Sequence, residues 1–215
     1  MYGMTETTPG RLSGRRAQAA RNDQPILDAA RAVFIADPDA PITAVAKHAG
    51  VGISALYSRY GSKEELLRKL CSDGLETFVA ETEAALADDR DYWTVLASYM
   101  RRLADADTSS MTVALAGTFT PTAEMFALAA RGGQLLSDLV DRVSDVLRPG
   151  VGAHDLSVIT ELVASVKEPD AKRTRELRHR YLAVILDGLR AEHSEPLPAS
   201  PPTWQEISDR WQPAT

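Results

Sequence analysis

The apolar residues of this chain recur with the period of an α-helix from about residue 26 to residue 192, and no segment alternates as a strand does. Helical periodicity marks a face that packs on a core, whereas a half-buried strand alternates with period two. The pattern predicts an all-α fold with about nine helices. The longest strictly apolar run, Tyr181–Leu186, has six residues. A membrane-spanning helix needs roughly 20, so we expect no membrane segment.

Two short helices joined by a tight turn are the most specific local pattern. The first is expected over Pro41–Ala49, where Gly50 ends it, and the second over Ile53–Tyr60. This spacing is typical of a helix-turn-helix. A preceding helix is expected from about Pro25 to Ala36, with Asn22 or Asp23 as its cap.

Longer helices are expected in the rest of the chain. Ser62 and Glu65 form the S-x-x-E pattern of a capping box, ahead of a helix that reaches about Leu86. The paired glycines Gly132-Gly133 are expected to bend or divide one later helix. The further helices are expected over Tyr92–Ala104, Met111–Ala116, Pro121–Leu147, Asp155–Val166, Asp170–Glu192 and Trp204–Trp211.

The helices 155–166 and 170–192 carry apolar stripes wider than one side of a small domain needs. We therefore expect burial on two sides, against the rest of the subunit and against a second copy of the chain. The residues predicted for the interface of such a homodimer are Leu156, Ile159, Leu182, Ile185 and Leu189.

Charge is unevenly distributed along the chain. The formal net charge is −6, which taken alone argues against a nucleic-acid partner. Residues 1–60 nevertheless carry seven Arg/Lys and five Asp/Glu, and Arg11, Arg15, Arg16 and Arg21 lie in a stretch without acids. A basic arm on an acidic protein suggests a local anionic partner. The alternative is a solvated tail that only aids solubility.

Residues 22–67 resemble the DNA-binding domain of the TetR family of bacterial transcriptional regulators. The matching segments are Ile26-Leu27-Asp28-Ala29-Ala30, Val33-Phe34, Val45-Ala46, Ala49-Gly50-Val51, Leu56-Tyr57, Tyr60 and Ser62 to Leu67. A weaker resemblance to the family's C-terminal domain rests on Arg148-Pro149, Asp155-Leu156, Leu186-Asp187-Gly188-Leu189 and Pro201-Pro202-Thr203-Trp204. The expected domains are therefore a flexible basic arm (1–21), a helix-turn-helix domain (22–67) and an effector-binding and dimerisation domain (68–215).

The resemblance implies a set of DNA contacts. The helix 53–60 would enter the major groove, and Gly52 would let the backbone approach a phosphate. Family members commonly have Gly-Thr where this chain has Ser54-Ala55. This difference bears on which bases the helix would prefer, and not on how it would bind. The alternatives are a core aromatic for Tyr57 and a solvated lysine for Lys63. The predicted DNA-binding residues are Arg16, Arg21, Thr43, Gly52, Ile53, Ser54, Ala55, Tyr57, Ser58, Arg59 and Lys63.

The C-terminal domain would hold a small apolar effector. The alternative for any one of the candidate pocket residues is ordinary core packing, since Met and aromatic residues at helical spacing usually pack together. The predicted pocket residues are Phe78, Trp93, Met100, Met111, Met125 and Phe126.

The sequence holds no motif of an enzyme active site. It lacks a glycine-rich phosphate loop, a G-x-S-x-G and an H-E-x-x-H, and its four histidines are scattered. With one cysteine, Cys71, a disulfide framework is excluded, and the position of Cys71 on an apolar helix face favours an inert thiol. We therefore expect no catalytic residues, no metal and no cofactor.

The sequence as a whole favours a cytoplasmic homodimeric transcription regulator, most simply a repressor. It would bind double-stranded DNA at a palindromic operator with half-sites about 10 bp or a multiple apart, and an effector would release it. Two alternatives remain at this point. A helical enzyme would show turnover, and a protein-interaction module would show no steep salt dependence on DNA.

Overall fold

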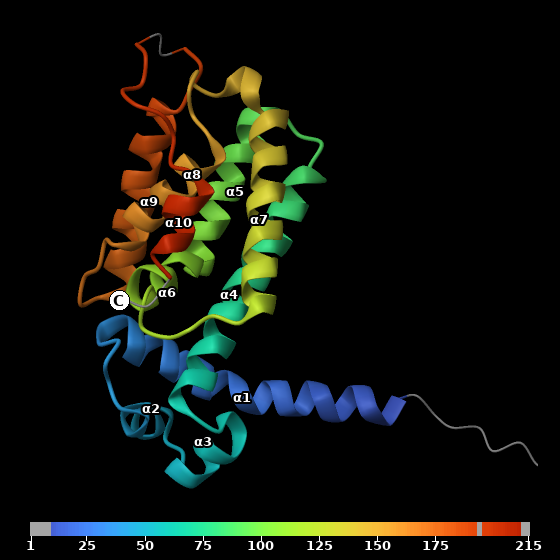
Figure 1. Ribbon diagram of the computed structural model, residues 1–215, viewed down its shortest axis with the longest axis vertical. Coiled ribbons are helices and arrows are strands. Elements are labelled where there is room, and N and C mark those ends of the chain that lie inside the picture. Colours follow the sequence, from blue (N-terminus) through green and yellow to red (C-terminus); the bar gives the residue numbers. More distant parts are fainter. Residues whose placement is uncertain (1–9, 193–194, 212–215) are drawn as a thin grey trace, which may run out of the picture. The chain divides into compact units, whose positions relative to one another are not determined.

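The computed structural model describes the backbone of residues 10–192 and 195–211, and side chains from residue 23 onward within these ranges. The described residues form ten α-helices and one 3-10 turn, and their only β-pairing is an isolated bridge between Leu147 and Arg190. The predicted all-α fold is thus confirmed (Figure 1). The elements are α1 (Gly10–Ala36), α2 (Ile42–Ala49), α3 (Ile53–Tyr60), α4 (Lys63–Leu86), α5 (Tyr92–Ala106), α6 (Thr108–Leu115), α7 (Ala123–Arg142), η1 (Ser144–Val146), α8 (Ala153–Ala164), α9 (Ala171–Gly188) and α10 (Trp204–Asp209).

The chain divides into two compact units, residues 1–66 and residues 67–215. In the first unit, α1 packs on α2, and α2 packs on α3. Four fully buried side chains, one from each of α1 to α4, form its centre: Phe34, Val45, Leu56 and Leu66. This small core fixes the positions of α2 and α3.

The first helix begins earlier than the sequence pattern indicates. We expected it to start near Pro25, but α1 begins at Gly10 and contains Pro25 in its interior. Residues 10–21, expected as part of a flexible arm, are therefore helical. This segment contains four arginines and three alanines, which are strong helix formers and offset the lack of an apolar face. Residues 1–9 of the expected arm lie outside the described residues.

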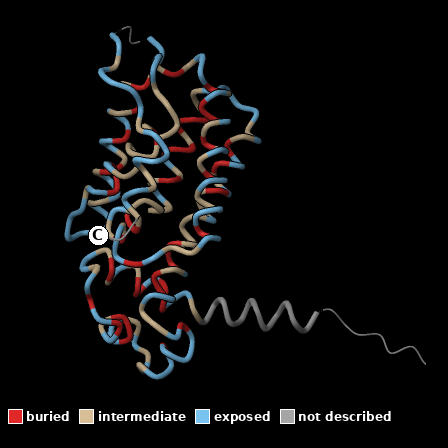
Figure 2. Tube along the Cα trace, viewed as in Figure 1, coloured by how far each residue is buried: buried red, intermediate tan, exposed pale blue. Residues whose placement is uncertain are grey.

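The second unit is a helical bundle in which α5 lies beside both α8 and α9, and α8 also packs on α6 and α7 (Figure 1). Figure 2 shows buried positions alternating with exposed ones along these helices, as amphipathic helices require. The centre of the bundle contains Leu96, Leu139, Leu156 and Leu182, each at most 1% exposed. None of the helices that the structure describes is long and apolar enough to cross a membrane.

The glycine pair does not divide α7, so that part of the expectation was wrong. The helix runs unbroken from Ala123 to Arg142 and ends at Val143, where the 3-10 turn follows. Gly132 is buried, and a Cβ there would lie 2.7 Å from the ring of Phe78. The absence of a side chain therefore serves close packing between α7 and α4.

A buried arginine in the middle of α9 joins the ends of three other helices in the second unit. The Arg178 guanidinium, on α9, donates to the carbonyl oxygens of Ala164 (2.8 Å) and Val166 (3.1 Å) at the end of α8. It also donates to the Asp107 carboxylate (2.6 Å) and the Ser110 hydroxyl (3.1 Å) at the α5–α6 junction. Arg178 is thus a buried charge with a carboxylate partner and several acceptors.

Candidate functional site

The turn between α2 and α3 has the geometry of a helix-turn-helix. Gly50 ends α2 in the left-handed conformation, with φ 68°, which an L side chain adopts only with strain. Its N–H and that of Val51 bond back to the last turn of α2, at Lys47 (3.3 Å) and Ala46 (3.0 Å). Gly52, in extended conformation, then precedes α3. The helix bounds predicted for this pair are confirmed to within one residue.

The outer face of α3 presents small polar and aromatic side chains. Ser54, Ala55, Tyr57 and Ser58 are all exposed, whereas Leu56 faces the core. Tyr57 is 47% exposed, which removes the alternative that it is a core aromatic. The first N–H groups of α3 have no side-chain cap, so they are free to donate to a ligand at the helix N-terminus.

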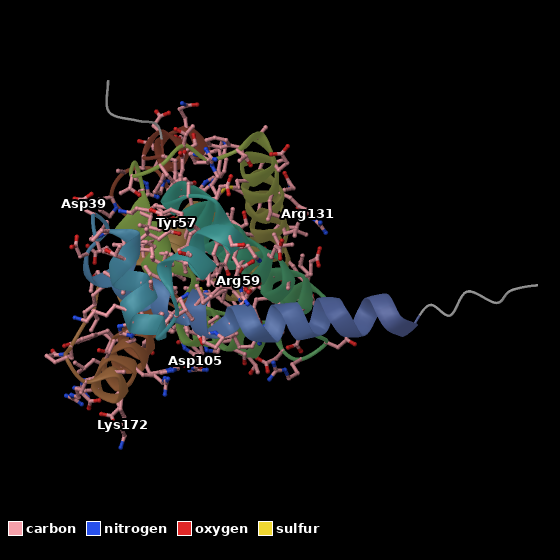
Figure 3. The ribbon with its side chains drawn as sticks, turned by 90° about the horizontal axis from the view of Figure 1, so that it is seen from below. Asp39, Tyr57, Arg59, Asp105, Arg131 and Lys172 are labelled. Carbon is pink, nitrogen blue, oxygen red and sulfur yellow. The ribbon has the colours of Figure 1, made fainter. Side chains whose placement is uncertain are left out.

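The two predicted cations of this region already have partners within the first unit. The guanidinium of Arg59 forms an ion pair with Asp23 on α1; Figure 3 labels Arg59 and Tyr57 on α3. The Lys63 ammonium donates to the Pro38 carbonyl (2.9 Å) and lies 5.2 Å from the centre of the Phe34 ring. An ammonium has three donors, so Lys63 retains capacity for a phosphate.

One side chain of this surface was missed in the sequence. Lys47 is exposed on α2, one turn beyond the exposed Thr43, so both lie on the same face. The i, i+4 spacing of Thr43 and Lys47 is the signal that could have identified it. The side chains of Arg11, Arg15, Arg16 and Arg21, predicted as arm contacts, lie outside the side chains that the structure describes.

The second unit contains a cavity of about 170 Å³. Its walls come from α4, α6, α7, α8 and α10. The lining side chains include Cys71, Leu75, Phe78, Met111, Met125, Phe126, His154, Ser157, Thr160, Glu161, Trp204, Ile207 and Trp211.

The cavity contains four of the six predicted pocket residues, namely Phe78, Met111, Met125 and Phe126. Met100 does not line it, because it is fully buried in the core of the bundle. Trp93 does not line it either, because its ring packs at the edge of that core under the Arg190 guanidinium, 4.2 Å from the ring centre. For Met100 and Trp93, ordinary core packing is the correct interpretation.

Sequence analysis missed the part of the cavity wall that α8 and α10 supply. Glu161, on α8, accepts two hydrogen bonds from Arg210, at 2.6 and 3.1 Å, which is a bidentate pair. Trp204 lies 6.3 Å from the His154 ring, measured between ring centres. The residues from 203 to 211 are far from α4 in sequence, and no local pattern connects them with it.

The Cys71 thiol is part of the cavity wall but is unreactive at neutral pH. Burial raises the pKa of this thiol to about 12, because desolvation disfavours the thiolate. At neutral pH the side chain is therefore a small apolar group with a protonated sulfur, as its place on the apolar face of α4 predicts. Among the described residues, no group of three His, Cys, Asp or Glu side chains is placed to hold a metal ion.

The five residues predicted for the dimer interface lie mostly inside a single subunit. Leu156, Leu182 and Leu189 are buried in the core of a single subunit, and Ile159 and Ile185 are partly buried against that core. The exposed part of the same stripes consists of Leu162 (58%), Tyr181 (46%) and Val184 (67%). The stripes are two-sided, as their width predicts, but the five chosen residues lie mainly on the inner side.

Comparison with known proteins agrees with this geometry. Residues 26–70 match the model of a family described as bacterial regulatory proteins, tetR family. This segment spans the helix-turn-helix and its supporting helices. Comparison with curated protein sequences finds no match.

Several solved structures share the fold. The regulator LfrR from Mycobacterium smegmatis, in complex with proflavine, has a TM-score of 0.61 at 21% identity, over 82% of this chain and 99% of that one. The ketosteroid transcriptional regulator KstR2 of Mycobacterium tuberculosis has a TM-score of 0.60 at 16% identity, over 78% and 94%. SCO0520 from Streptomyces coelicolor, a TetR transcriptional regulator, has a TM-score of 0.53 at 24% identity, over 79% and 99%.

The family match and the geometry of α2 and α3 lead to the same conclusion. A helix-turn-helix with an exposed second helix is the part of the molecule that the family model describes. Residues 26–70 are therefore a helix-turn-helix domain of the kind found in the tetR family of bacterial regulatory proteins, and the chain as a whole shares its fold with regulators of that family.

Proposed function

We propose that this protein is a ligand-responsive repressor that binds a palindromic operator as a homodimer and is released by a small effector. The observation that carries the proposal is the exposed face of α3, which follows an uncapped helix start and a tight glycine turn. In a helix-turn-helix, the residues near the start of the second helix reach the base edges of the major groove.

In this proposal the contacts divide into three groups. Ser54 and Ala55 face the bases, where they offer a hydroxyl and a methyl-sized apolar surface. Gly52, Ile53 and Ser58 lie at the groove walls. Phosphates are contacted by the remaining members of the set, which are Thr43, Lys47, Tyr57, Arg59, Lys63 and the arm residues Arg16 and Arg21.

The exposed apolar residues of α8 and α9 support the homodimer. Leu162, Tyr181 and Val184 are large apolar side chains on two helices that pack against each other. A second copy of the chain would bury them in a two-fold interface, in which the same patch is used by both subunits. Two-fold symmetry of the protein then requires two-fold symmetry of the operator.

The cavity supports a role for an effector. Its lining is mostly apolar with a few polar groups, the usual character of small-molecule sites. Four of its lining residues, Cys71, Gly74, Leu75 and Phe78, belong to α4, whose first residues belong to the helix-turn-helix unit. We propose that an occupied cavity shifts α4 and so changes DNA affinity. A coupling of about 1–3 kcal/mol would change it roughly 5–150-fold.

The salt dependence of DNA binding tests the DNA contacts. With five Lys or Arg side chains at the phosphates in each subunit, a dimer should neutralise about ten phosphates and lose affinity with a log–log slope near −9. Lys47→Ala removes one contact per subunit, so its slope should be less steep by about 1.8. The control is Lys172→Ala, an exposed lysine on α9, which should leave the slope unchanged. A flat salt response of the unmodified protein would contradict the proposal and favour a protein-interaction module.

Sedimentation tests the homodimer. Val184→Glu would place two charges in the two-fold interface, and we expect monomers at concentrations where the unmodified chain is a dimer. Val113→Glu is the matched control, because Val113 is a comparably exposed valine on α6 (44%). A Val184→Glu variant that sediments as the unmodified protein does would remove this face from the interface.

A further inference from the structure

The C-terminal segment forms one wall of the cavity. Trp204, Ile207 and Trp211 line it from residues 203–211, which contain α10. The Trp204 ring lies over Gly133 of α7, where a Cβ would be 3.8 Å away, and the Trp211 ring meets Phe119 edge to face at 5.8 Å. This wall is a six-residue helix between loops, in contrast to the long helices of the other walls.

The charge on the cavity wall is negative. Among the described residues that line the cavity, Glu161 is the only Asp, Glu, Lys or Arg. Its side chain is 15% exposed, and its partner Arg210, which is not part of the lining, is 39% exposed. Because a desolvated carboxylate without a counter-ion is costly, Glu161 needs a cation, and in this structure the C-terminal segment supplies it.

The size of the cavity limits the ligand to about one ring. A cavity of about 150 Å³ in another protein accepts benzene, and this one measures about 170 Å³. Trp204, Trp211, Phe78 and Phe126 supply aromatic faces, which attract a cation through the ring quadrupole. The cavity volume, the aromatic rings and the Glu161 carboxylate therefore all favour a small aromatic cation. An anionic ligand would be repelled by the Glu161 carboxylate.

We propose that the cavity binds a one-ring organic cation whose ammonium group replaces the Arg210 guanidinium at Glu161. The aromatic ring occupies the space between Phe78, Phe126 and Trp204. Exchange of one cation for another keeps Glu161 paired and releases α10 from its ion pair with α8. This inference deepens the proposed effector site, since it names the chemical class of the ligand and the contact that the ligand breaks.

The first test compares three probes of nearly equal size, benzylammonium, benzyl alcohol and benzoate, by calorimetry on the full chain at pH 7 without DNA. We expect benzylammonium to bind at least tenfold more tightly than benzyl alcohol, and benzoate to bind most weakly. Equal affinities for the three probes, tighter binding of benzoate, or no binding of any probe would overturn the proposal.

The second test asks whether Glu161 contacts the ligand or only holds α10 in place through its ion pair with Arg210. Glu161→Gln and Arg210→Met break the same ion pair. If the pair only holds α10 in place, both variants should therefore change the affinity for benzylammonium in the same way. If Glu161 receives the ligand, Glu161→Gln should weaken benzylammonium binding at least tenfold, and Arg210→Met should strengthen it several-fold because the competitor is gone. Benzyl alcohol should respond alike in both variants. A benzylammonium affinity that shifts in the same direction in both variants would overturn the proposal.

Two controls complete the experiment. Arg131→Met breaks the ion pair of Arg131 with Glu83, which are not among the residues lining the cavity, and should leave all probe affinities unchanged. If Glu161→Gln does not fold, the ranking of the three probe affinities on the unmodified protein still decides whether the proposal stands. These measurements contain no DNA, so they test the ligand class separately from the proposed function. If the protein ranks the three probes as expected but fails to bind DNA, the proposed function is contradicted and this inference stands.

Discussion

At the scale of single residues, Gly132 and Gly133 show how adjacent positions of one helix have different requirements. A Cβ on Gly132 would lie 2.7 and 2.8 Å from two ring atoms of Phe78, closer than atoms approach in folded proteins. A Cβ on Gly133 would make an ordinary contact with Trp204, at 3.8 Å. The sequence shows only a glycine pair, which suggests a bend, whereas the neighbours that α4 and α10 supply decide its role.

The two alanine variants should therefore change stability in opposite directions. Gly133→Ala should raise the free energy of unfolding by up to about 1 kcal/mol, because alanine favours a helix interior. Gly132→Ala has the same helix gain but displaces the Phe78 ring, and we expect a net loss of about 1–3 kcal/mol. Urea unfolding of both variants measures the difference. Equal stabilities would mean that Phe78 moves aside at no cost.

Cys71 provides a prediction about pH. Since burial raises its pKa from 9.0 to about 12, the thiolate fraction at pH 8 should be about a thousandfold lower in the folded protein. Alkylation by iodoacetamide should be correspondingly slow, and its rate should rise tenfold per pH unit beyond pH 9 rather than level off. The same shift favours the folded state fully below pH 9, and this contribution is lost as the pH rises toward 12. Rapid alkylation at pH 8 without denaturant would contradict the burial.

At the scale of helices, the pattern of apolar residues predicted α2 and α3 well because glycine and proline mark their ends. Proline sits just before α2, and Gly50 and Gly61 end α2 and α3. The start of α1 could not be predicted in this way, because residues 10–21 have neither an apolar face nor a stop signal. The stripes of α8 and α9 predicted two contact faces, but which residues face inward depends on how α5 packs against both helices.

The Arg178 guanidinium connects α9 with the end of α8 and with the α5–α6 junction through hydrogen bonds. Arg178→Met should lower the free energy of unfolding by about 3–5 kcal/mol, since it leaves the Asp107 carboxylate without its counter-ion and two carbonyl groups without the guanidinium donor. Asp107 is also held in the left-handed conformation, with φ 52°. The exposed Arg175 on the same helix is the control, and Arg175→Met should change stability by less than about 0.5 kcal/mol. Similar losses in both variants, measured by urea unfolding, would contradict this role.

At the scale of the whole molecule, the two units differ in how well their proposed functional residues can be predicted from the sequence. The proposed DNA-binding face lies on two consecutive short helices, so a local pattern could predict it, apart from Lys47. The cavity is assembled from α4, α6, α7, α8 and α10, which span residues 63 to 209. Its apolar lining was partly predicted from residue type, but the Glu161–Arg210 pair depends on tertiary packing and could not be.

The central claim is that α3 reads a DNA sequence in a two-fold arrangement. Selection of bound duplexes from a random library, with the purified chain at moderate salt, tests it most directly. We predict a two-fold symmetric motif with half-sites about 10 bp or a multiple of this apart, and a changed half-site for the double variant Ser54→Gly, Ala55→Thr. Recovery of no motif at moderate or low salt, or of the same half-site with the double variant, would contradict the account.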